Sequence, residues 1–153
     1  MASPDSQLDA IITQLEIELA KITTANNYHT NVKKIYLNPD EWMAFAVLPS
    51  ILIDYGSGDE SKYSEKRVEI DDTLRLRVAF KNQVDSPACT QIAKFLTDLR
   101  HLLYHNCPNL TDGSGNKLVT TVRISSRVAD HAESSPLRIL AVNLEVDYDE
   151  AIV

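Results

Sequence analysis

The sequence predicts an α+β fold, a mostly antiparallel sheet of about five strands with two main helices packed on it. Two observations support this: two segments carry apolar residues at helical spacing, and several others alternate between apolar and polar residues. The chain has 153 residues, enough for one domain with a sizeable core and too few for two. We therefore predict a single domain over residues 1–153.

The first helix is predicted near the N-terminus, where apolar residues recur at steps of three and four. These are Leu8, Ile11, Ile12, Leu15, Leu19 and Ile22. The polar residues between them are expected elsewhere on the helix surface: Gln14, Glu16, Glu18 and Lys21. Asn26 and Asn27 follow, and Asn is one of the few residues that accept the left-handed conformation of a helix C-terminus. The helix should end there.

Two short strands are predicted next, at residues 32–37 and 50–55. The second contains three consecutive apolar residues, which suggests burial on both faces. Residues 39–49 lie between them and are bounded by prolines, so they form either a loop or a short helical turn. Residues 56–62 are small and charged, and we interpret them as a mobile connection.

The longest strand signal covers residues 67–81, where apolar and polar residues alternate. Such alternation predicts one packed face and one wet face in an antiparallel sheet. Asp72 falls on the apolar side and predicts a bulge or a bend. Residues 118–128 and 137–148 repeat the alternation. Their inward residues should be Leu118, Val122, Ile124, Val128, Leu140, Val142, Leu144, Val146 and Tyr148.

The second helix is predicted to open at Ser86-Pro87, which provide an N-cap and a first-turn proline, and to close at Pro108. Its buried face should contain Ile92, Phe95, Leu96, Leu99, Leu102 and Leu103. Cys89 and Cys107 would lie roughly 27 Å apart on one helix, whereas a disulfide needs Cα atoms within about 7 Å. We expect two free thiols without a catalytic role.

Composition limits the possible functions. The chain is 44% hydrophobic and 24% charged, as in ordinary globular proteins, and no apolar run approaches the roughly 20 residues that span a bilayer. The N-terminal residues do not show the basic region followed by an apolar core that is typical of a secretion signal, so we do not expect secretion. The net charge of −7 argues against a general nucleic-acid binder, which needs clustered Lys and Arg.

One alternative is a small metal-dependent enzyme, because Asp98, His101 and His105 follow one another at helical steps. Lys94 joins the same stripe, opposite the leucines, so a solvated helix face is the preferred interpretation. His29 and His131 fall in predicted turns, where a polar loop residue is the default. Residues 113–117 end a glycine-rich turn with a lysine, but their spacing does not fit a P-loop. We predict no catalytic residue, no metal and no cofactor.

Two segments are candidate contact surfaces with another subunit or a partner. The apolar cluster between the first two strands comprises Trp42, Met43, Phe45, Val47 and Leu48. If this cluster is exposed, it would favour association with another molecule. An alternative of equal weight is that the segment forms a flap that covers the sheet of its own subunit. The charged arm at residues 56–65 could order on contact with a partner or form a disordered tip. Its candidate residues are Asp59, Glu60, Lys62 and Tyr63.

Both ends of the chain resemble tailed-bacteriophage tail terminator proteins, also called tail completion or neck proteins. The residues that carry the resemblance are the L-x-x-I-I-x-x-L pattern from Leu8, the segment ITTANNYHTNV at 22–32 and RILAVNLEVDY at 138–148. Proteins of this family often carry Gly before the tyrosine, where this chain has Asn27. These motifs are loose patterns of residue type.

The resemblance implies a structural virion protein of the tail or neck, assembled in the host cytoplasm. Copies would form a ring, commonly of six subunits, that caps the tail tube and joins the tail to the head connector or stopper protein. DNA would pass through the lumen without specific binding, and the negative charge would assist passage if acidic residues line the channel. Another neck connector, such as a head-completion or stopper protein, is the nearest alternative.

Overall fold

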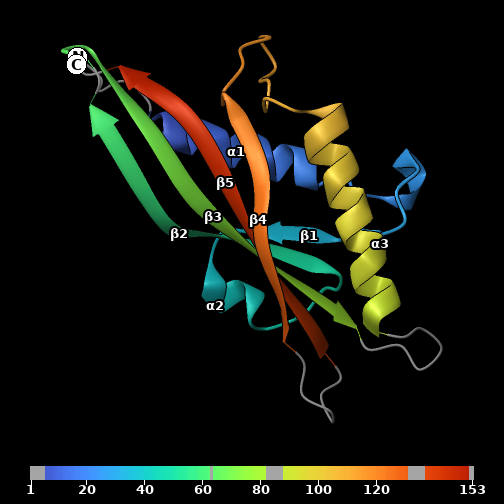
Figure 1. The fold of residues 1–153 in the computed structure, drawn as a ribbon. Coiled ribbons are helices and arrows are strands. Elements are labelled where there is room, and N and C mark those ends of the chain that lie inside the picture. Colours follow the sequence, from blue (N-terminus) through green and yellow to red (C-terminus); the bar gives the residue numbers. More distant parts are fainter. Residues whose placement is uncertain (1–5, 63, 82–87, 131–136, 152–153) are drawn as a thin grey trace.

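The computed structural model describes residues 6–62, 64–81, 88–130 and 137–151. Its five-stranded sheet has the order β1-β2-β3-β5-β4, with β1 parallel to β2 and every other neighbouring pair antiparallel. The strands are β1 (Lys34–Tyr36), β2 (Ser50–Lys62), β3 (Arg67–Lys81), β4 (Thr121–Asp130) and β5 (Leu137–Ala151). The helices are α1 (Gln7–Leu19), α2 (Pro39–Trp42) and α3 (Ala88–Arg100). The predicted α+β fold is confirmed (Figure 1).

Helix α1 packs its predicted apolar face on the sheet. Ile11, Leu15 and Leu19 are fully buried. The predicted end of the helix at Asn26-Asn27 is wrong, because α1 ends at Leu19 and the left-handed Asn27, at φ 68°, instead follows a separate 3-10 turn over Thr24–Asn26. The prediction that Gln14 and Glu18 lie away from the buried face is wrong. Both side chains are buried because they have polar partners: Gln14 Nε2 donates to Glu18 Oε1 at 2.9 Å, and Lys21 Nζ lies 3.0 Å from the same carboxylate. Partnered polar side chains can therefore border the apolar stripe.

Helix α3 covers the same face of the sheet as α1, because its side chains join the same core. Phe95 and Leu99 are fully buried, and Phe80 meets Phe95 edge to face with ring centroids 5.8 Å apart. A π-helical turn at His101–Asn106 continues the helix and places Leu102 and Leu103 in the core. The predicted opening at Ser86-Pro87 lies outside the described residues.

Strand β2 is much longer than predicted. The interpretation of residues 56–62 as a mobile connection is wrong, because Ser57 to Lys62 pair with β3 from Thr73 to Val68. The backbone hydrogen bonds of this ladder compensate for a sequence rich in Gly and Ser. The ends of β2 and β3 reach past both helices in Figure 1, at upper left. Every residue of β2 from Tyr55 to Lys62 is exposed.

Asp72 occupies the position where a bulge was predicted, but the register shifts in the neighbouring strand, between Tyr55 and Ser57 of β2. The Asp72 carboxylate is buried and accepts hydrogen bonds from Tyr55 Oη at 2.8 Å and Tyr148 Oη at 2.5 Å. Gly58 lies opposite, where a Cβ atom would collide with Asp72 Oδ1 and Tyr55 Oη. A polar residue is thus stable on the apolar side because two tyrosines satisfy it.

Strand β4 begins later than predicted, and a shift of register in its middle changes which face of the sheet its side chains occupy. Leu118 is buried as predicted but precedes the strand, which starts at Thr121. The register against β5 shifts between Ile124 and Ser126. Val128 consequently lies on the other face and is 66% exposed, so its predicted inward orientation is wrong. The predicted inward residues of β5 are all buried: Leu140, Val142, Leu144, Val146 and Tyr148.

Candidate interaction face of the sheet

Among the residues that the structure describes, the face of the sheet opposite α1 and α3, here called the open face, is covered only at one end. There the segment 39–49 folds back on β1, β2 and β3. Asn38 caps α2 by accepting a hydrogen bond from Asp40 N at 3.0 Å, and Pro39 occupies its first turn. Trp42 is 3% exposed and packs in a small cluster with Tyr36, Leu52 and Ala79. At Trp42, the segment therefore covers the sheet of its own subunit, as the flap alternative predicts.

The other predicted apolar residues of this segment are not fully covered. Phe45 contacts Trp42 edge to face, with ring centroids 5.1 Å apart, and is half-buried like Leu48. Met43 is 62% exposed and Val47 is 38% exposed. The segment is thus a flap with an apolar outer surface, so it leaves these side chains available for contact with another molecule.

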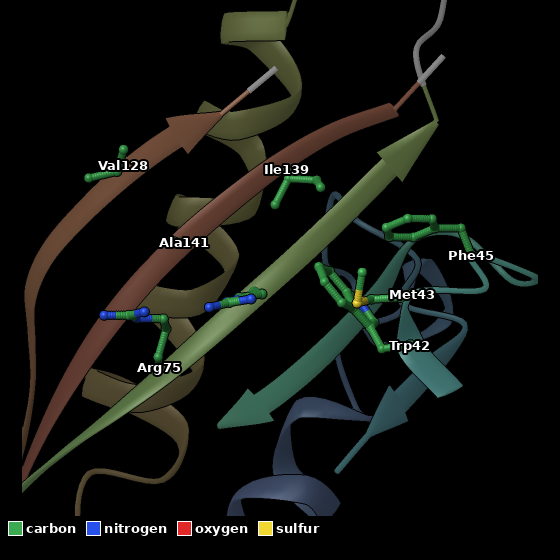
Figure 2. Close-up of a pocket in the computed structure, with 8 residues that line it drawn as sticks. Trp42, Met43, Phe45, Arg75, Val128, Ile139 and Ala141 are labelled. Atoms are coloured by element: carbon green, nitrogen blue, oxygen red, sulfur yellow. The ribbon is translucent and has the colours of Figure 1, made fainter. Parts of the chain in front are cut away.

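A hollow of about 420 Å³ opens beside the flap, and we call it the arginine hollow (Figure 2). Its lining residues are Trp42, Met43, Phe45, Arg75, Arg77, Val128, Ile139 and Ala141. Figure 2 shows the flap residues on one side, Val128 and Ile139 on the other, and Arg75 reaching over the sheet. Arg75 Nε donates to Asn143 Oδ1 at 3.4 Å. Among the described residues, no carboxylate forms an ion pair with Arg75 or Arg77.

Sequence reasoning missed the two arginines as candidate site residues. The available signal was their position, because Arg75 and Arg77 alternate with buried Leu74, Leu76 and Val78 and therefore share the wet face of β3. Val128 could not be included, since the shift of register in β4 that exposes it leaves no sign in the alternation. The hollow is a product of the fold, which brings β3, β4, β5 and the flap together.

Carboxylates gather at the far end of the open face, and we call this group the acidic end. It comprises Asp59, Glu69, Asp71, Asp147 and Asp149. Asp71 lies opposite Asp59 on β2 and opposite Asp147 on β5. Burial, with the neighbouring Asp147 carboxyl, raises the pKa of Asp71 to about 6. Like charges are therefore crowded here.

Cationic side chains border the acidic end in the described part of the chain, and one of them, Lys117, lines a hollow together with Arg67 and Asp149. Arg123 of β4 forms an ion pair with Glu145 of β5, between the acidic end and the arginine hollow. Arg67 shares the open face at the tip of β3, opposite Ala151. The two ends of the open face thus differ in charge: the hollow has two arginines that form no ion pair with a described residue, although Asp54 lies opposite Arg75 in the strand register, and the acidic end has carboxylates.

The predicted arm residues divide between the two faces of the sheet. Asp59 belongs to the acidic end, whereas Glu60 and Lys62 pair with Ile70 and Val68 and therefore share the opposite face. All three arm residues are exposed, and Lys62 Nζ lies 3.7 Å from a carboxylate oxygen of Glu65. Tyr63 lies outside the described residues.

The stripe of polar residues on α3 is not a solvated face throughout. Asp98 is 3% exposed and accepts hydrogen bonds from His29 N at 3.0 Å and Thr30 N at 2.7 Å, so that part of the prediction is wrong. Two backbone N–H groups of a loop need an acceptor there, which explains the burial. His101 and His105 are exposed, with stacked rings 5.0 Å apart. The Asp98 carboxylate thus connects α3 to the loop after α1 by hydrogen bonds.

The remaining candidates are possible metal ligands and the two cysteines. No group of three or more His, Cys, Asp or Glu side chains in the described part of the chain is arranged to hold a metal ion. Cys89 is exposed and Cys107 is buried, and both are free thiols. Burial raises the pKa of Cys107 to about 12, and its Sγ donates to Leu102 O at 3.2 Å. His131 lies outside the described residues.

Comparisons with known proteins add no family assignment: no family model matches this chain, and no match to a curated protein was found. Within the described residues, every helix is too short or too polar to cross a membrane.

Proposed function

We propose that this chain is a structural subunit of a tailed-phage neck, a tail terminator whose copies form a ring on the end of the tail tube. The proposal rests on the resemblance of residues 8–32 and 138–148 to this family and on the α+β fold that the resemblance implies. The chain would join the tube to the head connector, with DNA passing through the lumen. Six subunits are common in such rings, which close by repeating one heterologous interface.

The observation that carries the proposal is the exposed end of the β2–β3 hairpin. Residues of β2 from Tyr55 to Lys62 are exposed although they alternate between the two faces of the sheet. A regular strand ladder with little packing on either face is costly to order, because its backbone loses conformational freedom while few apolar groups are buried. A partner that packs on the hairpin would compensate for this cost, as expected for a subunit of an assembly.

The flap supplies a second uncovered surface on the same subunit. Met43 and Val47 expose apolar atoms at the opposite end of the open face from the acidic end. Two distinct contact surfaces are what a head-to-tail ring needs, since each subunit meets one neighbour with each surface.

Co-sedimentation tests the proposal. The purified chain is mixed separately with tail tubes and with tail-less heads, and each mixture is centrifuged. A tail terminator sediments with tubes, and electron microscopy locates it at the tube end that faces the head. Sedimentation with heads alone would instead identify a head-completion or stopper protein. A chain that binds neither particle contradicts a role in the neck.

A further inference from the structure

We infer that copies of this chain bind one another head to tail through the open face, with the acidic end of one copy docked on the arginine hollow of the next. This interface rests on the proposed function only for what the assembly does; the contact itself is argued from the two surfaces. The occupant of the hollow is thus a second copy of the chain. Charge complementarity between the two ends of the open face is the argument for this choice.

The arginine hollow has the composition of an interface centre. Its walls are aromatic and aliphatic, with Trp42 and Phe45 on the flap and Ile139 on β5. Arg75 and Arg77 are half-buried, and neither forms an ion pair with a described residue. Aromatic residues, Met and Arg are the types enriched where proteins bind proteins. An acidic partner would neutralise both guanidinium groups.

The acidic end supplies the complementary surface. Asp71 faces Asp59 and Asp147 directly, with Glu145 also close enough to act on it. The raised pKa of Asp71 reflects burial and the repulsion between these carboxylates. A guanidinium group placed over them by a neighbouring copy would relieve that repulsion. Arg123 is already engaged with Glu145 within the subunit.

The two surfaces lie at opposite ends of the open face, so one copy can contact two neighbours. Ala141 borders the hollow, and Asp147 of the acidic end lies six residues further along β5. At about 3.3 Å per residue, the two surfaces are roughly 20 Å apart on one rigid sheet. In the inferred assembly these two surfaces bind different neighbours, which is a heterologous contact that closes when the rotation permits. A native mass above two subunits distinguishes this ring from a two-fold dimer, in which both surfaces would bind the same neighbour.

The test uses two charge-reversed variants of the full chain. The acidic variant carries Arg75→Glu and Arg77→Glu, and the basic variant carries Asp71→Arg and Asp147→Arg. A control carries Lys94→Glu and Arg100→Glu, two exposed residues of α3, and has the same change in net charge as the acidic variant. Circular dichroism and thermal unfolding establish that each variant is folded. Self-association is measured by native mass spectrometry and analytical ultracentrifugation over a range of concentrations.

We expect the wild type and the control to self-associate alike, and each charge-reversed variant alone to associate at least about 100-fold more weakly. An equal mixture of the two variants should recover association, because every contact in an alternating assembly joins opposite charges. If either variant fails to fold, the milder variants Arg75→Gln with Arg77→Gln and Asp71→Asn with Asp147→Asn replace them and should also associate more weakly.

Two results would overturn the inference: a wild type that stays monomeric at every concentration, or variants that associate alone as the wild type does. Failure of the mixture to recover association would also overturn it, provided that both variants are folded. Binding to tail tubes is a separate measurement. A chain that binds tubes without this interface retains the proposed function and loses the inference, whereas one that self-associates by charge complementarity without binding tubes does the reverse.

Discussion

The two faces of the sheet are built by the same alternating strands but are completed differently. The face under α1 and α3 is closed by the chain itself, where Ile11, Leu15, Phe95 and Leu99 are fully buried. Of the segments that the structure describes, only the flap covers the open face, and Met43 and Val128 remain exposed beside its arginine hollow. The difference separates residues that hold the fold from residues that are available to a partner. Mutations on the two faces should therefore have different consequences.

The largest effect is expected from truncation in the helix-covered core. Phe95→Ala removes a fully buried ring in contact with Phe80 and should reduce the free energy of unfolding by about 3–5 kcal/mol. Urea denaturation measures the change. Val128→Ala is the matched control on the open face and should change stability by less than about 0.5 kcal/mol. Equal losses for both variants would remove the distinction between the faces.

Loss of the buried carboxylate of α3 should have the next largest effect. Asp98→Ala leaves the backbone N–H groups of His29 and Thr30 without their acceptor, at a cost of about 2–3 kcal/mol. Lys94→Ala, on the exposed side of the same helix, is the control and should be close to neutral. Asp98→Asn retains one acceptor oxygen and should lie between them. A neutral Asp98→Ala variant would restore the interpretation of Asp98 as a solvated residue.

A smaller, pH-dependent effect should distinguish the acidic end from other carboxylates. The pKa of Asp71 is about 6 in the folded chain, against an ordinary value of 3.8. The folded chain holds this proton more tightly, so wild-type stability decreases as the pH rises from about 3.8 to about 6. Asp71→Asn removes that decrease and should be more stable than the wild type above this range. The gain should stay under about 1 kcal/mol, because Asp71 is only partly desolvated and solvent screens the repulsion between its carboxylate and its neighbours.

Urea denaturation of the wild type and of Asp71→Asn, below and above this pH range, provides the measurement. Glu41→Gln, at an exposed position of α2, is the control. Parallel pH profiles for the wild type and Asp71→Asn would show that the carboxylates of the acidic end do not repel one another. The pH-dependent loss of stability assigned to Asp71 would then be absent.

The smallest effect on stability is expected at the edge of the hollow. Met43→Ser with Val128→Ser changes two exposed side chains and should alter the free energy of unfolding by less than about 0.5 kcal/mol. Self-association should nevertheless weaken, because apolar surface at the interface is lost. Thermal unfolding and ultracentrifugation of the same samples check both parts. Unchanged association would exclude these two side chains from the interface.

Local patterns predicted most of the fold. The alternation in residues 67–81 matches the observed bounds of β3, and the apolar spacing near the N-terminus matches the buried face of α1. The extension of β2 through Lys62 was missed because pairing with β3, which depends on residues distant in sequence, overrides the turn preference of Gly and Ser. The shift of register in β4 was missed for the same reason.

The candidate site was predicted only in part. The sequence singled out the flap, but not which of its residues cover the sheet: Trp42 is buried and Met43 is exposed. Arg75 and Arg77 became notable only when the fold placed them beside the flap without ion-pair partners among the described residues. Likewise, Asp59, Asp71 and Asp147 are scattered in sequence and meet only through strand pairing. Proximity of this kind is a property of the tertiary structure.

The native mass of the particle tests the central claim, that the open face serves to assemble copies of the chain, most directly. It should be measured for the chain alone and after addition of tail-tube protein. We predict a closed oligomer whose mass is a whole multiple of 17.1 kDa, sixfold for a hexamer, for the chain alone and again with the tube protein present. A single 17.1 kDa species under both conditions would contradict the claim.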